Sequence, residues 1–167
     1  MSRKFGWFIF SLVILMLTGC AHRSINTDQC RVMLFQYQLA SDLKSDGVKV
    51  VVVGDEVTLI LRTNQFFYAN SNHMRDRGPE LNRIIAYINT YHPIEDIQVK
   101  GYTSNIGNYT RNLALSRAQA QAISNYMWKH GLNSRLISAE GYGCHNPYGF
   151  NHIEIFFRLP PPDNVFH

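Results

Sequence analysis

The sequence predicts an α+β fold in which helices pack on a mixed β-sheet. Two β-branched, apolar runs flank Gly54-Asp55, which is typical of a hairpin with a two-residue turn. Two strand-helix-strand units then follow one another, and such units require helices on a sheet with right-handed crossovers. The final run, His152 to Leu159, alternates apolar and polar residues as a half-buried strand does.

The elements can be placed in chain order. Asp28 to Leu43 has apolar residues at near-helical intervals, which predicts an extra helix ahead of the sheet. The hairpin spans Val48 to Thr63. A helix begins near Gly78-Pro79, because the apolar residues after it follow i, i+3, i+4, i+7 spacing. The remaining elements are strand Ile97 to Gly101, helix Tyr109 to His130, and strands Leu136 to Tyr142 and His152 to Leu159.

The N-terminus has the pattern of an export signal. Arg3 and Lys4 precede an apolar run that is too short to cross a bilayer but suits the core of a signal peptide. The segment Leu17-Thr18-Gly19-Cys20 resembles the bacterial lipobox, which implies that Cys20 is lipidated; a buried cysteine after an ordinary signal peptide is the alternative. Ala21 follows, where inner-membrane lipoproteins carry aspartate. We therefore expect a lipid anchor on the periplasmic face of the outer membrane.

This pattern divides the chain into four segments. They are a signal peptide (1–19), a lipidated tether and helix (20–47), one α+β domain (48–160) and a tail (161–167).

Charge and cysteine content narrow the function classes. The formal charge of +4 falls to +2 once Arg3 and Lys4 are removed, which is too little to indicate nucleic-acid binding. Cys30 and Cys144 remain in an oxidising compartment, where they form either a disulfide or two free thiols.

No catalytic or metal constellation is evident in the sequence. The seven histidines are scattered, and His145 beside Cys144 supplies two ligands where a structural zinc needs four. Ser116 lies in a predicted helix and not on the sharp turn that a nucleophilic serine requires. We expect neither an enzyme nor a cofactor.

The spacing from Gly101 to Pro147 resembles the peptidoglycan-binding C-terminal domain of the OmpA family. The family pattern G-[HY]-T-D-x-x-G, followed by N-x-x-L-S-x-x-R-A, corresponds here to Gly101, Thr103, Gly107, Asn112 and the segment Leu115 to Ala120. The resemblance covers Val57 to Leu159 and implies a βαβαββ arrangement of two helices on a mixed sheet. Within it, Phe66 to Met74 corresponds to an aromatic strand and the loop after it.

Two positions depart from that pattern. Ser104 stands where the family has aspartate, and Gln119 where it has arginine. In the family these two charged groups grip the diaminopimelate of the peptide stem. Serine and glutamine offer only neutral hydrogen bonds, which are weaker than charge-assisted ones. The sequence thus predicts a degenerate peptidoglycan site of Thr103, Ser104, Gly107, Asn112 and Gln119, with weak or absent binding.

These observations favour a structural lipoprotein over a wall-binding module. The layout resembles the small OmpA-like lipoprotein of the Dot/Icm type IVB secretion outer-membrane core, which implies envelope or secretion-complex partners. A tether between outer membrane and cell wall is the alternative. The helix Asp28 to Leu43 either packs on its own domain or contacts a partner through Val32, Phe35 and Leu39.

Overall fold

The computed structural model describes residues 27–91 and 93–160. The chain divides into two compact units, Met1–Met33 and Leu34–His167. Helix α2 (Thr27–Ser45) begins in the first unit and ends in the second. The sheet and the candidate site lie wholly in the second unit.

The second unit is built on a five-stranded mixed sheet, as predicted. The strand order is β1-β2-β5-β3-β4, in which β3 and β4 are parallel and the other neighbours antiparallel. The strands are β1 (Lys49–Val53), β2 (Glu56–Arg62), β3 (Ile97–Tyr102), β4 (Ile137–Gly143) and β5 (His152–Arg158).

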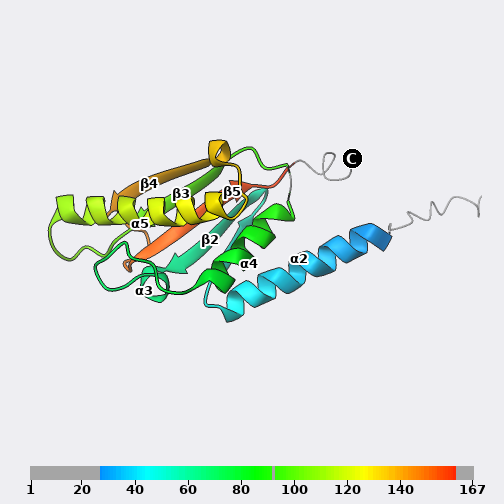
Figure 1. Ribbon diagram of the computed structural model, residues 1–167, viewed down its shortest axis with the longest axis horizontal. Helices are drawn as coiled ribbons and strands as arrows, with labels where there is room; N and C mark the ends of the chain where they lie inside the picture. The colour runs from blue at the N-terminus through cyan, green and yellow to red at the C-terminus, as the bar shows by residue number, and fades with distance from the viewer. Residues whose placement is uncertain (1–26, 92, 161–167) are drawn as a thin grey trace, which may run out of the picture. The chain divides into compact units, whose positions relative to one another are not determined.

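The two long helices of the domain lie on one face of this sheet (Figure 1). They are α4 (Gly78–Asn89) and α5 (Tyr109–Lys129). Two short pieces were not predicted: the single turn α3 (Thr63–Phe66) and the 3₁₀ turn η1 (Ser134–Leu136). None of the described helices is both long and apolar enough to span a bilayer.

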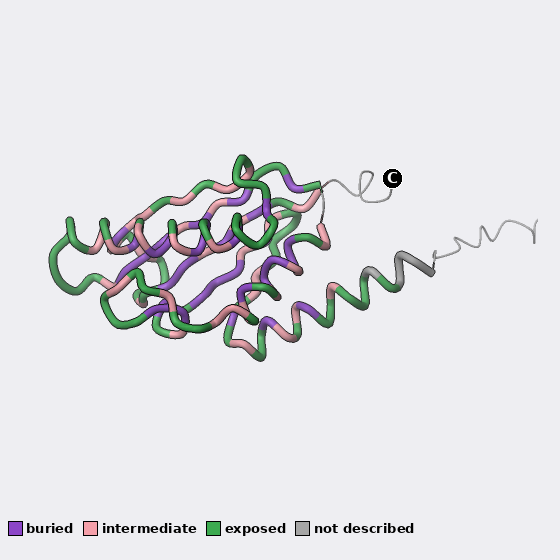
Figure 2. The backbone as a smooth tube through the Cα atoms, in the orientation of Figure 1, coloured by how far each residue is buried: buried purple, intermediate pink, exposed green. Residues whose placement is uncertain are grey.

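The buried residues lie along the strands and along α4 and α5 (Figure 2), and their apolar members form one hydrophobic core. Register places Val57 opposite Phe157 and Leu59 opposite Ile155, and these four side chains are all buried. Alternation along β2 and β5 therefore points one apolar row at α4 and α5, as the period of two predicts.

The hairpin turn is confirmed at Gly54-Asp55, since Val53 pairs with Glu56 across it. Gly54 has φ of 63°. Among the described residues Asn70 is the one non-glycine with a positive φ, so Asp55 has a negative φ. A positive φ at the first central position alone is the signature of a type II′ turn.

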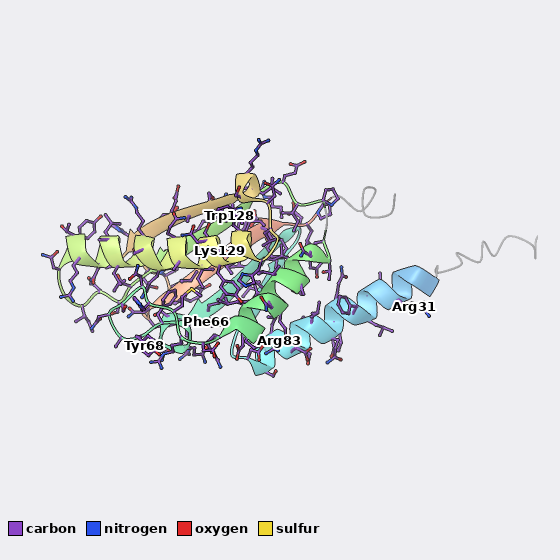
Figure 3. All side chains as sticks on the ribbon, in the orientation of Figure 1. Arg31, Phe66, Tyr68, Arg83, Trp128 and Lys129 are labelled. Carbon is purple, nitrogen blue, oxygen red and sulfur yellow. The ribbon has the colours of Figure 1, made fainter. Side chains whose placement is uncertain are left out.

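The C-terminal half of α2 packs on the domain. Leu39 and Leu43 are buried in the core, with Leu39 only 7% exposed. The Gln36 amide donates to the Thr90 carbonyl (3.3 Å). Arg83 of α4 lies beside the end of α2 and makes two hydrogen bonds to the Asp46 carboxylate, at 2.6 and 2.7 Å (Figure 3). These contacts fix the orientation of α2 from Gln36 onward.

The expected aromatic strand at Phe66 is wrong. The chain instead forms α3, ending at Phe66, and then a single bridge between Phe67 and Met74. Phe66 and Phe67 are both buried. Helix α3 ends at Phe66 and the backbone is already extended at Phe67, so the two adjacent rings are not consecutive residues of one strand.

Helix α5 lies directly on the backbone of β3 and β4 at two glycines. A Cβ atom at Gly101 would overlap the Ser116 carbonyl, and one at Gly141 would overlap the Arg117 backbone. The buried Ser116 hydroxyl donates to the Leu113 carbonyl (2.9 Å) and accepts from the Gly143 N–H (3.0 Å). Gly101, Gly141 and Ser116 of the sequence motif thus serve the packing of α5 on the sheet.

The other face of the sheet carries aromatic rings covered by cations. Lys100 lies over Phe156 at 4.9 Å, and Arg62 lies over Phe150 at the same distance. Tyr102 stacks between Tyr142 and His152, at 5.2 and 4.6 Å between ring centroids. Burial raises the pKa of Tyr102, so its hydroxyl stays protonated well above neutral pH.

We expect Gly101→Ala to lower the free energy of unfolding by about 3 kcal/mol, because α5 must move away from the sheet to admit the methyl group. Gly131→Ala is the matched control. Gly131 has φ of 107° but open space around it, so alanine there costs only backbone strain of about 1 kcal/mol. Chemical denaturation measures both. Equal destabilisation by the two substitutions would contradict the packing role of Gly101.

Candidate functional site

The candidate site surrounds the loop between β3 and α5. Thr103 anchors its start: its N–H donates to the Gly143 carbonyl (2.8 Å), and its own carbonyl accepts from the Asn146 amide (2.9 Å). Gly107 has φ of 97°, a left-handed conformation that favours glycine. Asn108 then caps α5 by accepting from the Arg111 N–H (3.1 Å). The loop is therefore held at both ends.

Asn112 ties the middle of this loop to α5. Its side-chain amide donates to the carbonyls of Ser104 (3.4 Å) and Ile106 (3.0 Å). The Ser104 N–H donates to the side-chain oxygen of Asn151, which directly precedes β5. The predicted site residues Thr103, Ser104 and Asn112 thus belong to one network, which Asn146 and Asn151 complete.

Ser104 opens onto a hollow of about 410 Å³. Its wall combines residues from the end of β2, the loop after α3 and the segment before β5. They include Arg62, Asn64, Tyr68, Asn70, Ser104 and Asn151. Among the described residues that line the hollow, Arg62 carries the one formal charge, and none is acidic. A ligand ammonium finds no carboxylate here.

Gln119 reaches the same loop from the helix side. It is only 4% exposed, and its amide donates to the Ser71 carbonyl at 2.8 Å. Ser71 directly follows Ala69 and Asn70, which line the hollow. The residue at the family's arginine position therefore fixes a wall of the hollow by an internal hydrogen bond.

One polar group of the candidate site, the Thr103 hydroxyl, is buried without a partner; Gln65 Oε1 and Arg77 Nε are the other such atoms among the described residues. The Thr103 hydroxyl makes no hydrogen bond to any described residue, although it is shielded from solvent. A buried polar group without a hydrogen-bond partner destabilises the folded state and is therefore uncommon in a folded domain. The Thr103 hydroxyl lies on the residue next to Ser104, at the base of the loop.

The cysteine predictions lie mostly outside the described residues. Cys20 belongs to the range 1–26, and the side chain of Cys30 is likewise not described. Cys144 is half-buried and forms no disulfide with a described residue. Lipidation of Cys20 and the Cys30–Cys144 bridge stay predictions. Among described side chains, no group of three potential metal ligands occurs.

Sequence reasoning missed Arg62, Asn146 and Asn151. Arg62 ends a strand, and the two asparagines lie in an irregular segment between β4 and β5. Side-chain amides are frequent in such segments, so neither asparagine carried a signal that separated it from an ordinary loop residue.

The mixed sheet, the loop after β3 and the glycine contacts under α5 define an α+β domain with two helices on one face of the sheet. Residues 66–150, just over half of the chain, match the model of the OmpA family. The chain therefore belongs to the OmpA family.

Individual relatives agree with this assignment. The chain is 25% identical to the probable lipoprotein YiaD of Escherichia coli K12 over 114 residues, 68% of this chain and 52% of that protein. It is 29% identical to outer membrane protein A of Salmonella typhi over 89 residues, 52% of this chain and 25% of that one. The chain thus spans about half or less of these relatives.

A solved structure gives the same result. The cell wall anchor of the T6SS from Pseudomonas aeruginosa superimposes with a TM-score of 0.63 and 25% identity, covering 73% of this chain and 94% of that one.

We expect Gln119→Met to lower the free energy of unfolding by about 1–3 kcal/mol, because it leaves the Ser71 carbonyl without its partner while keeping side-chain volume. Gln121→Met on the exposed side of α5 is the control. Hydrogen exchange of the loop 69–72 should rise in the first variant and stay constant in the second. Unchanged exchange in Gln119→Met would show that the bond does not hold the loop.

Proposed function

We propose that this protein is a non-catalytic structural subunit of an envelope-spanning assembly. In this proposal it is an outer-membrane lipoprotein whose periplasmic OmpA-like domain has lost its wall ligand. A secretion core of the type IV, Dot/Icm-like kind is the assembly that its layout fits best. One observation carries the proposal: none of the described residues that line the hollow beside Ser104 is acidic, and the Gln119 amide already donates to the Ser71 carbonyl.

The missing charges matter energetically. A diaminopimelate group offers an ammonium and a carboxylate, which bind most strongly to opposite charges. Replacing two charge-assisted interactions by neutral ones costs ~2 to 5 kcal/mol of binding free energy. That loss corresponds to roughly tenfold to several thousandfold in affinity. Arg62 can attract a carboxylate, but its guanidinium also lies over the Phe150 ring.

The proposed attachment to the membrane is inferred from the sequence pattern of the N-terminus. Cys20 would carry the acyl chains, and a short tether would join it to α2. Similarity to a probable lipoprotein from Escherichia coli supports this arrangement.

The surface of α2 offers room for a partner. Leu39 is in the core, so packing on the domain is the correct account for this residue. Phe35, in contrast, is 56% exposed, and Leu34 and Tyr37 beside it are also exposed. The side chain of Val32 lies outside the described residues. A cluster of exposed Leu, Phe and Tyr is typical of the apolar part of an interface.

A wall tether is the second candidate function. The similarity to a T6SS cell wall anchor supports it, as does the intact frame of the loop around Ser104. The two candidates differ in the affinity that they require for peptidoglycan.

We expect the wild-type chain to bind sacculi weakly, and Ser104→Asp combined with Gln119→Arg to bind at least about tenfold more tightly, because the two charges are restored. A pull-down with diaminopimelate-containing sacculi measures this. Ser134→Asp with Gln121→Arg adds the same charges at exposed positions and is the control. Wild-type binding equal to that of the restored variant would favour the wall tether.

We expect gentle detergent extraction of native envelopes to recover the protein together with other subunits, and Cys20→Ser to abolish its membrane fractionation.

Phe35→Glu should release the partners without loss of folding, because Phe35 is exposed. Leu39→Glu should unfold the domain, because it places an unpaired charge in the core. Mass spectrometry of the extract identifies the subunits. Recovery of the protein without any other subunit would overturn the assembly proposal.

A further inference from the structure

Strand β1 is an edge of the sheet, and no described strand pairs with its outer side. It lies at one end of the strand order and pairs with β2 alone among the described residues. Edge strands are usually protected by charge, proline, a bulge or a covering element. Here the strand reads Lys-Val-Val-Val-Val, is regularly paired, and has Val52 and Val53 exposed at 53% and 68%.

The free backbone groups of β1 can be identified from its turn. Val53 and Glu56 flank a two-residue loop and so form a hydrogen-bonded pair. Because such pairs alternate along an antiparallel ladder, Val51 and Lys49 also bond to β2. Val50 and Val52 consequently direct their N–H and C=O groups outward. No described residue bonds to these four groups.

We propose that this edge pairs with the β1 edge of a second copy of the chain, in antiparallel orientation about a twofold axis at Val51. In this register Val50 lies opposite Val52 of the second copy, and Val52 lies opposite Val50 of that copy. All four outward groups on each copy are then satisfied, and the two sheets become one. Displacing the axis to Val52 would place Val50 opposite Gly54 in the turn, where the strand has already ended.

Charge favours a second copy as the occupant. The proposed register places Lys49 opposite Val53 of the other copy, next to that copy's Asp55. Asp55 is exposed, and no described side chain forms an ion pair or hydrogen bond with its carboxylate. The twofold axis repeats this lysine-aspartate contact at the other end of the strand. No like charges face each other, because the three positions between are valines.

The contact is small and therefore weak in dilute solution. It requires no lipid anchor, but copies held on one membrane meet at a high local concentration, where weak pairing suffices. The inference thus goes beyond the proposed function and can succeed or fail independently of it.

Cysteine cross-linking tests the register. Val51→Cys in the full-length chain should form a disulfide-linked homodimer on mild oxidation, in native envelopes or with concentrated purified protein. Facing residues of a non-hydrogen-bonded pair have Cα atoms about 4.5 Å apart, close enough for a disulfide. Val53→Cys is the matched control. The two copies of residue 53 are four residue steps apart, about 13 Å, so the homodimer yield should be about tenfold lower.

A second substitution distinguishes disulfides that form through pairing at the β1 edge from disulfides that form by random collision. Val52→Pro removes an outward N–H without removing a bond to β2, so it should abolish the Val51→Cys dimer while the thermal unfolding temperature changes little. Equal yields from Val51→Cys and Val53→Cys would overturn the proposal. Disulfides from Val51→Cys to a different protein would also overturn it, because the occupant would then be another chain. Co-purification of other subunits bears on the proposed function alone.

Discussion

The close approach of α5 to the sheet is the constraint on which the rest of the domain depends. At Gly101 and Gly141 the helix backbone occupies the space that side chains would take. The Ser116 hydroxyl then bridges the helix to Gly143 at the end of β4. This contact sets where α5 begins, and hence where the loop from Thr103 to Asn108 must turn. The loop and the hollow beside it are consequences of that packing.

In this fold, the packing and hydrogen bonds that hold the loop after β3 do not depend on the charged groups that bind a ligand. The glycines, Ser116 and Asn112 hold the loop in place through packing and neutral hydrogen bonds, none of which needs a ligand. This chain carries neutral residues at the two charged positions of the family and keeps the fold. Gln119 illustrates the outcome: it keeps its place on α5 but holds the neighbouring loop through Ser71. A domain of this kind can keep its shape while its surfaces take on another role.

Much of the fold could be predicted, because period and turn chemistry are local properties of the sequence. The Gly54-Asp55 turn and the alternation in β5 are examples. The aromatic strand at Phe66 was wrong because two adjacent buried rings are compatible with more than one backbone. For the site, the sequence located Ser104 and Gln119 but gave no indication of Arg62 or Asn151. Those residues join the hollow through contacts between distant segments, which no local pattern encodes. The same holds for Leu39 and Phe35, which lie four residues apart on α2 but differ in burial.

The loop at the candidate site is held by the side-chain amides of Asn112, Asn146 and Asn151. Amides neither gain nor lose a proton over the range in which proteins stay folded. A cleft that grips its ligand through a carboxylate weakens as acid protonates that group. The side-chain hydrogen bonds that hold the loop described here involve no carboxylate. They should therefore persist when the surrounding medium turns acidic.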